Sequence, residues 1–319
     1  MDATRERGDR FLGLARELDR PAPSPPLKRP EPRPPRALRP NQLSVTRIET
    51  LRRDPYAIYA EHILELEPLN PIGPEVGPIE IGNVWHAALE AFAKGAVAGE
   101  APDIARARLL AIAEEKFSPL NADPAFRILR WPRILDGLET FLSFDAEHRE
   151  LAANIWIELG GRLEIPLRDS AIFTLTARAD RIEQWHDGGA ALIDYKTGAP
   201  PGVPEVQVGF APQLTLEAAM LARGGFKDIG PLEASTAFYL KLGGADGGFT
   251  RELKFKDESF HDVVERHFAG LKALVEQFAD ETTPYLSRPF AKFAGRGDDY
   301  DHLARVKEWS ATGGAGDEP

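Results

Sequence analysis

Residues 177–198 read ARADRIEQWHDGGAALIDYKTG and contain two strand-like segments on either side of a turn at 186–189. Apolar and polar residues alternate on both sides of the turn, which is typical of an antiparallel hairpin. A loop centred on Asp187 puts Asp180 directly opposite Asp194, so both carboxylates would lie on one face with Cβ atoms about 4.5–5.5 Å apart. A shift of one residue would send them to opposite faces.

Two facing carboxylates repel each other, so this pairing favours a cation between them. Lys196 lies two residues beyond Asp194 and shares its face, whereas Tyr195 points to the other face. Mg²⁺ and Mn²⁺ prefer oxygen ligands, and such an ion can orient a water and offset charge that develops on a phosphoryl group. The hairpin therefore predicts hydrolysis of a phosphodiester, with Lys196 positioning the water or stabilising the anionic transition state.

A surface charge ladder is the alternative interpretation of the same residues. In such a ladder Asp180 pairs with Arg178 or Arg181, and Asp194 pairs with Lys196. Exposed ion pairs of this kind are common on strand faces and need no metal ion.

The segments around the hairpin predict an α/β protein whose first half is mostly helical. We expect a three-stranded meander and two later strands, at 155–167, 171–185, 190–196, 234–242 and 249–255. We expect helices at 81–98, 102–116, 124–150, 212–222 and 258–280, with a break at Trp131-Pro132 inside the third. A short helical pattern also runs from Tyr300 to Trp309.

Two helix starts are predicted near the beginning of the body. Thr46-x-x-Glu49 is a capping-box pattern, and the helix it opens would bury Ile48 and Leu51. Asp54-Pro55 restarts the helix, because aspartate suits the N-cap and proline suits the first helical position.

Composition excludes several kinds of site and protein. The 319-residue chain is 43% hydrophobic and 28% charged, as ordered proteins are. It has no cysteine, which excludes disulfides, thiolate metal sites, iron-sulfur clusters and a cysteine nucleophile. No GxxxxGK(S/T) phosphate loop occurs, so this chain cannot by itself be an ATP-driven motor. Residues 1–20 lack the apolar stretch of a signal peptide or spanning helix, so we expect a cytoplasmic location and no membrane contact.

The net charge of -11 restricts how the protein could meet nucleic acid. Affinity for a polyanion comes largely from lysine and arginine, and a basic excess lies in residues 21–40, which also contain nine of the 27 prolines. Contact with DNA must therefore use a local basic groove, or metal ions and a partner must supply affinity.

We expect four regions along the chain. Residues 1–20 form a short amphipathic helix with Phe11, Leu12, Leu14 and Leu18 on its apolar side, either as a partner-seeking helix or as a frayed tail. Residues 21–42 form a basic, proline-rich linker in extended polyproline II conformation. Residues 43–310 form the main domain, and 311–319 form a flexible tail.

The order of these motifs resembles the PD-(D/E)xK nucleases in their RecB-like form. The segments SVTRIETLRRDPYAIYA, GNVWHAALEAF, TARADRIEQW, ALIDYKTGAPP and APQLTLEAAML look like the C-terminal nuclease domain of the AddB subunit of AddAB-type helicase-nucleases. The resemblance covers residues 43–310. It implies a restriction-endonuclease-like core with a mixed central β-sheet flanked by helices. It also implies a Mg²⁺- or Mn²⁺-dependent nuclease that cuts single-stranded DNA during recombinational repair of double-strand breaks, beside an AddA-like helicase-nuclease partner.

The resemblance also assigns roles to individual residues. Asp180 and Asp194 resemble the metal ligands, Lys196 the catalytic lysine, and the backbone carbonyl of Tyr195 a further ligand. His86, in Gly82-x-x-x-His86, resembles the histidine near the metal. The additional acid beside the metal is Glu158, with Glu164 as the alternative on the same strand face. Gln213 resembles a glutamine that contacts the nucleic acid or a water.

Two departures from the family pattern matter. Relatives with an iron-sulfur cluster have cysteines near Asp54 and in the 295–309 segment, so here packing of Tyr300, Leu303 and Trp309 must join the two ends instead. Glu217 stands four residues after Gln213, where RecB-like proteins often have a tyrosine, which puts base stacking there in doubt.

Two other functions fit the same residues less well. A stand-alone RecB-like exonuclease, closer to the Cas4 group, would act without a motor, and the missing cysteines and the linker disfavour it. A nuclease-fold scaffold would bind DNA or a partner without cutting, but it has no use for facing carboxylates.

Overall fold

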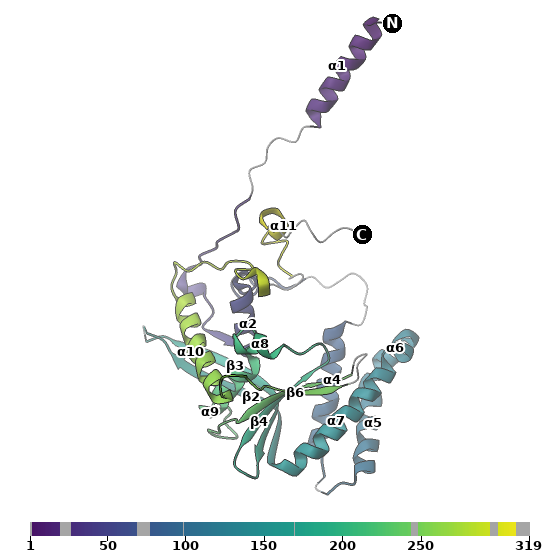
Figure 1. Cartoon of the computed structure of the whole chain (residues 1–319), viewed down its shortest axis with the longest axis vertical. Coiled ribbons are helices and arrows are strands. Elements are labelled where there is room, and N and C mark those ends of the chain that lie inside the picture. The colour runs from purple at the N-terminus through teal and green to yellow at the C-terminus, as the bar shows by residue number, and fades with distance from the viewer. Residues whose placement is uncertain are drawn as a thin grey trace.

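A mixed sheet of six strands lies at the centre of the protein (Figure 1). The computed structural model describes residues 2–19, 27–68, 77–97, 99–168, 170–243, 248–293 and 299–310. The strands are β1 (Gln42–Ser44), β2 (Ala152–Pro166), β3 (Ile172–Trp185), β4 (Ala190–Lys196), β5 (Thr236–Lys241) and β6 (Phe249–Glu252). Their order is β1-β3-β4-β5-β6, and β2 also pairs with β3. The β1–β3 and β4–β5 pairs are parallel and the others antiparallel, which confirms the predicted mixed sheet.

The predicted hairpin and its register are confirmed. Arg181 lies opposite Ile193 and Ile182 opposite Leu192, so Asp180 and Asp194 occupy the next position along the two strands. The turn closes with a hydrogen bond from the Trp185 N–H to the Gly189 carbonyl. Residue 188 has a φ of 92°, a conformation that glycine adopts without strain.

Strand β3 divides its second edge between two neighbours. Its first edge pairs with β2 from Ile172 to Trp185, with no register partner for Asp180, whereas the second pairs with β1 at Thr174–Thr176 and with β4 at Arg181–Gln184. Residues 177–180 therefore have no ladder partner on this second edge within the described structure. Asp180 stands where β3 and β4 begin to separate, which leaves its side chain free to project between elements.

Helices cover both faces of the sheet (Figure 1). Because side chains alternate along β4, Leu192 packs toward α9 while Ile193 and Tyr195 join the opposite core. The first face is covered by α2 (Val45–Arg53), α8 (Val203–Gln207), α9 (Gln213–Ala222) and α10 (Phe260–Ala279). The second is covered by α4 (Pro78–Lys94), α5 (Pro102–Asn121), α6 (Pro124–Leu129) and α7 (Trp131–Leu151). This arrangement confirms the predicted α/β fold and its helical first half.

The helix boundaries agree with the sequence in most places. Asp54 caps α3 (Pro55–Ile58) by accepting from the Tyr56 N–H, and Pro55 is its first residue, as predicted. The break near Trp131-Pro132 is confirmed, since α6 ends at Leu129 and α7 begins at Trp131.

Three local predictions were wrong or incomplete. The N-cap of α2 is Ser44, whose hydroxyl accepts from the Arg47 N–H, and not Thr46. The helix expected from Tyr300 to Trp309 is limited to α11 (Val306–Trp309). Strand β1 was not predicted, because its three residues are too few to show a period.

The C-terminal segment packs against the start of the body, as expected for a cysteine-free chain. Tyr300 packs with Ala57 and Ala60 of the helical segment that continues through the π-helical turn Tyr59–Ile63, and its hydroxyl donates to the Leu66 carbonyl at 2.6 Å. Leu303 and Trp309 pack around Tyr56. Ordinary apolar contacts thus join the two ends.

The structure describes only part of the predicted terminal regions. An N-terminal helix, α1 (Asp2–Leu18), is present, and Phe11, Leu12, Leu14 and Leu18 are exposed on it. The expected tail at 311–319 lies outside the described residues, and the expected linker is described only from residue 27 onward. In the described part of the chain, no helix has the length and apolar character needed to cross a membrane.

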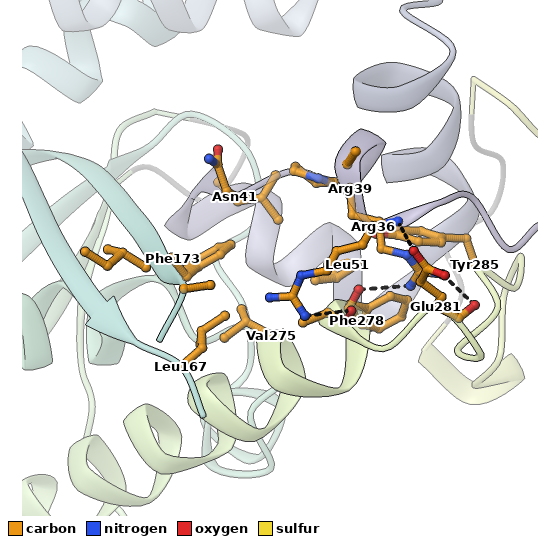
Figure 2. A pocket seen from close by; sticks show the side chains of 16 residues that line it. Arg36, Arg39, Asn41, Leu51, Leu167, Phe173, Val275, Phe278, Glu281 and Tyr285 are labelled. Carbon is orange, nitrogen blue, oxygen red and sulfur yellow. Dashed lines mark hydrogen bonds between the residues drawn. The ribbon is translucent and has the colours of Figure 1, made fainter. Parts of the chain in front are cut away.

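The described part of the proline-rich segment lies along the body. The Tyr285 N–H donates to the Pro32 carbonyl at 2.9 Å, and the Arg36 N–H donates to Glu281 Oε1 at 2.7 Å. Figure 2 shows Arg36 and Arg39 beside Phe278, Glu281 and Tyr285, at one end of a cavity of about 690 Å³. A short 3-10 helix, Arg36–Leu38, leads from this segment toward β1.

Arg39 caps the C-terminal end of α10. Its guanidinium is buried and donates to four backbone carbonyls, those of Pro34, Phe278, Glu281 and Thr283, at 2.9–3.2 Å. Carbonyls in the last turn of a helix have no partner inside the helix. A cation there also interacts favourably with the negative end of the helix dipole. One side chain thus joins the proline-rich segment to the end of α10.

We predict that Arg39→Ala lowers the free energy of unfolding by about 3 kcal/mol, because buried carbonyls lose a charged donor. Arg33→Ala is the matched control, since Arg33 belongs to the same segment but is exposed, and it should change stability by less than about 1 kcal/mol. Urea unfolding followed by tryptophan fluorescence measures both. Equal losses in the two variants would contradict the capping role.

Candidate active site

Six predicted site residues come from five elements that meet where β3 and β4 separate. Asp180 lies on β3, and Asp194 and Lys196 lie at the end of β4. Glu158 lies on β2, His86 on α4, and Gln213 is the first residue of α9. The predicted residues therefore gather at one place, although the chain separates His86 from Gln213 by more than a hundred residues.

His86, Glu158 and Asp180 form one group. His86 Nδ1 lies 3.1 Å from Glu158 Oε1 and 3.5 Å from Asp180 Oδ1. One ligand atom of each residue lies within 4.8 Å of the others, so the three could hold a metal ion. The second oxygen of Asp180 accepts the Tyr195 N–H at 2.8 Å, which fixes the carboxylate between β3 and β4.

Glu158, rather than Glu164, lies in this group. The backbone at Glu158 has a φ of 51°, which is rare for a residue other than glycine inside a strand and costs about 1–3 kcal/mol. Arg178 holds the other carboxylate oxygen at 2.7 Å. Glu164 is exposed and lies opposite Thr174, farther along the β2–β3 ladder. The strained backbone is therefore kept at the glutamate that faces His86.

Asp194, Lys196 and Gln213 form a second group. Lys196 Nζ lies 2.7 Å from Asp194 Oδ2 and donates to Gln213 Oε1 at 3.2 Å. Gln213 Nε2 donates to Asp194 Oδ1 at 2.7 Å. Each member thus touches the other two, which fixes the ammonium group of Lys196 at the end of the strand.

Burial makes the facing carboxylates difficult to ionise together. Burial, followed by repulsion from Asp194, raises the pKa of Asp180 to about 7. Burial also raises the pKa of Asp194, although Lys196 opposes the change. The pKa of Glu217 is raised well above its usual range, first by burial and then by the two aspartates. Burial thus disfavours full ionisation of these acids, and a bound cation would oppose that effect.

Neighbouring carboxylates raise the pKa of both basic residues of the site. Burial alone would lower the pKa of Lys196, but the adjacent Asp194 carboxylate outweighs it and the pKa is raised. A hydrogen bond with Glu158, helped by the charge of Asp180, raises the pKa of His86 against the effect of burial. Lys196 is therefore an ammonium donor at neutral pH and not a general base.

The residues present suit a hard divalent cation. Three carboxylates and one imidazole face the same region, and oxygen ligands of this type favour Mg²⁺ or Mn²⁺. Asp194 Oδ2 is buried and accepts no well-directed hydrogen bond, although Lys196 is close to it. An unsatisfied carboxylate oxygen beside mutually repelling acids is what a cation site needs. The part expected of the Tyr195 carbonyl stays a prediction.

The charge-ladder interpretation does not describe this geometry. Arg178 pairs with Glu158, and Arg181 pairs with Asp145 and Glu183, so Asp180 is left to His86. The pairing of Asp194 with Lys196 is present, but it lies in a buried site that also includes Gln213.

A buried polar network, which the sequence patterns did not indicate, lies behind the site. Arg181 is fully buried on the face of β3 opposite Asp180 and donates to Asp145 on α7 and to Glu183, at 2.6 Å each. Glu183 also contacts His148 Nδ1 at 2.8 Å and accepts from the Trp185 indole. The available signal in the sequence was the spacing of this arginine and glutamate, which lie two residues apart on one strand face. The network fixes α7 against the strand that carries Asp180.

We predict that Asp180→Asn stabilises the metal-free protein at pH 8, because it removes an ionised, buried carboxylate. The pKa of Asp180 is higher in the folded than in the unfolded chain, so the folded wild type binds the extra proton and loses stability as the pH rises from about 4 to 7. Thermal melts in EDTA should show the variant melting at least about 3 °C higher at pH 8. The gap should close toward pH 5, and a gap that widens there would refute the charge argument.

We predict that Glu158→Gln weakens Mn²⁺ binding at least about tenfold, because it removes a charged ligand while keeping the side chain's shape. Glu164→Gln is the matched control on the same strand and should bind Mn²⁺ like the wild type. Electron paramagnetic resonance of free Mn²⁺ during titration measures binding without reference to activity. Equal affinity in the two variants would remove Glu158 from the ligand set.

Comparison with known proteins identifies the family. Residues 42–292 match the PD-(D/E)XK nuclease superfamily. A protein of Rickettsia bellii, described as uncharacterized, is 30% identical over 279 residues, which cover 83% of this chain and 32% of the relative. An uncharacterized protein of Rickettsia typhi is 34% identical over 212 residues, covering 64% of this chain and 24% of the relative.

The chain spans about a third or less of the length of these relatives. The crystal structure of SSO0001 matches 73% of this chain and 76% of its own, with 13% identity and a TM-score of 0.32. Since the superfamily match includes the whole sheet and every predicted site residue, the chain belongs to the PD-(D/E)XK nuclease superfamily.

Proposed function

We propose that the chain is a metal-dependent nuclease domain that hydrolyses phosphodiester bonds in single-stranded DNA. The observation that carries the proposal is the position of Lys196. Its charged ammonium is held by Asp194 and Gln213, at the end of the strand that faces the group of His86, Glu158 and Asp180. A metal-binding group and a fixed cation side by side suit a reaction in which negative charge grows on phosphate oxygens.

The acidic residues and the histidine would hold the metal. His86, Glu158 and Asp180 supply one side, and Asp194 supplies the unsatisfied oxygen on the other. When bound, Mg²⁺ or Mn²⁺ offsets phosphoryl charge and lowers the pKa of water. The Tyr195 N–H keeps Asp180 turned toward the site, and Arg178 keeps Glu158 turned toward it.

Lys196 and Gln213 would act on the phosphate. Because the pKa of Lys196 is raised, its ammonium donates hydrogen bonds to a phosphate oxygen and stays charged as the transition state forms. Gln213 Nε2 donates to Asp194 and lies 3.3 Å from Glu217 Oε1, so the amide orientation is fixed from two sides. Glu217 thereby positions Gln213 and does not provide a stacking surface for a base.

A helicase partner would supply the affinity for DNA that the negative charge of this chain opposes. The chain has a net charge of -11, which opposes unaided binding of a polyanion. The relatives continue well beyond the matched third, as a nuclease carried by a larger subunit would. We therefore favour an AddB-type subunit that works beside an AddA-like helicase-nuclease in the cytoplasm, receiving single strands during recombinational repair of double-strand breaks.

We predict that Lys196→Ala lowers the cleavage rate at saturating single-stranded DNA at least about 100-fold, because a fixed donor to the phosphate is lost. Lys254→Ala is the control, since Lys254 carries the same charge and its side chain is 78% exposed; it should retain activity. Release of labelled nucleotides with Mn²⁺ measures both. Equal activity of Lys196→Ala and the wild type would refute the proposed function.

A further inference from the structure

A second cleft, of about 710 Å³, opens beside Lys196 and Gln213. Its walls come from α2, the 199–201 loop, β5 and the segment around Arg288. We propose that this cleft binds one nucleoside of the DNA strand, next to the phosphodiester bond that is cut. The inference rests on the proposed function and adds to it a site for a base and its sugar.

The position of the cleft connects it to the reaction. Lys196 and Gln213 line the cleft and also belong to the catalytic group around Asp194. A phosphate held by Lys196 therefore has its neighbouring nucleotide at the mouth of this space. On the other side of Asp180, a DNA strand would meet His86, Glu158 and Arg178 instead. The cleft volume falls within the range of about 300–1,000 Å³ that is usual for small-ligand sites.

Tyr239 supplies an unsatisfied polar group in the wall of the cleft. The residue lies on β5 directly beside Asp194 and is only 1% exposed. Its hydroxyl is buried and has no hydrogen-bond partner within the described structure. Leaving such a group unpaired costs about 1–3 kcal/mol. A ligand oxygen or nitrogen in the cleft would satisfy this hydroxyl.

The charges in the cleft favour an uncharged ligand over a second phosphate. Arg53 is already paired with Glu49 and Glu205, and Arg288 is paired with Asp301. The acidic groups therefore offset the two guanidinium groups. Base and sugar are the uncharged parts of a nucleotide. A nucleoside therefore suits a cleft whose guanidinium groups are already paired with carboxylates.

The loop wall is apolar and fixed before any ligand arrives. Ala199, Pro200 and Pro201 form this wall. Arg251 on β6 donates to the carbonyls of Pro200 and Pro201 at 3.1 and 2.9 Å, which holds the loop against the sheet. A wall fixed in advance lowers the entropy cost of binding. The 199–201 loop thus presents a rigid apolar wall to a flat base.

Two substitutions test the cleft. Tyr239→Phe removes the unpaired hydroxyl and keeps the ring, whereas Thr50→Phe projects a ring into the cleft from α2. Tyr56→Phe is the control, since the Tyr56 hydroxyl donates to the Leu303 carbonyl and does not line the cleft. Saturation-transfer NMR with millimolar deoxyadenosine in EDTA reports binding of the nucleoside alone. Steady-state cleavage of a labelled single strand with Mn²⁺ reports KM and kcat separately.

We expect deoxyadenosine to bind the wild type and Tyr56→Phe, to bind Tyr239→Phe at least threefold more weakly, and not to bind Thr50→Phe. In cleavage, KM should rise at least fivefold in Tyr239→Phe and more in Thr50→Phe, with kcat within twofold of the wild type. No saturation transfer to the wild type, or equal transfer in all four proteins, would overturn the inference even if DNA is cut. Nucleoside binding that depends on the cleft, in a protein that cleaves no DNA, would instead overturn the proposed function alone.

Discussion

The repulsion between Asp180 and Asp194 is the constraint on which the site depends. The hairpin register brings these two carboxylates to facing positions on adjacent strands. Burial removes the water that would otherwise screen their repulsion. The protein compensates locally with the Tyr195 N–H, His86 and Lys196. These groups leave the pKa of both aspartates raised, so the folded chain stores unfavourable electrostatic energy that a divalent cation would release. Stability and function are opposed at this point, as is common in active sites.

The remaining architecture keeps the two acids in place. Within the described structure, strand β3 has no ladder partner on its second edge at residues 177–180, and this gap leaves Asp180 room to turn toward His86 and Glu158. On the opposite face, buried Arg181 fixes the strand to α7. On the face that α9 and α10 cover, Arg39 joins the proline-rich segment to the end of α10. The Arg181 network therefore holds the strand that carries Asp180 from behind, while Lys196 at the end of β4 lines the cleft.

Local sequence patterns were enough to predict the hairpin. Features that depend on contacts between distant segments could not be predicted from such patterns. The turn and the alternation fix the register of Asp180 and Asp194, because both signals lie within about twenty residues. Glu158 and Glu164 share one strand parity, so pattern alone cannot choose between them; the choice follows from where α4 places His86. The Arg181 network and strand β1 likewise depend on segments distant in sequence. The family resemblance supplied roles that the residues alone left open.

The most direct test of the metal site is anomalous diffraction from crystals of the wild-type protein soaked in Mn²⁺. The account predicts one strong manganese peak between β3 and β4, within coordination distance of carboxylate oxygens from both Asp180 and Asp194. A peak that contacts neither aspartate, or no peak at a Mn²⁺ concentration that supports DNA cleavage, would contradict it.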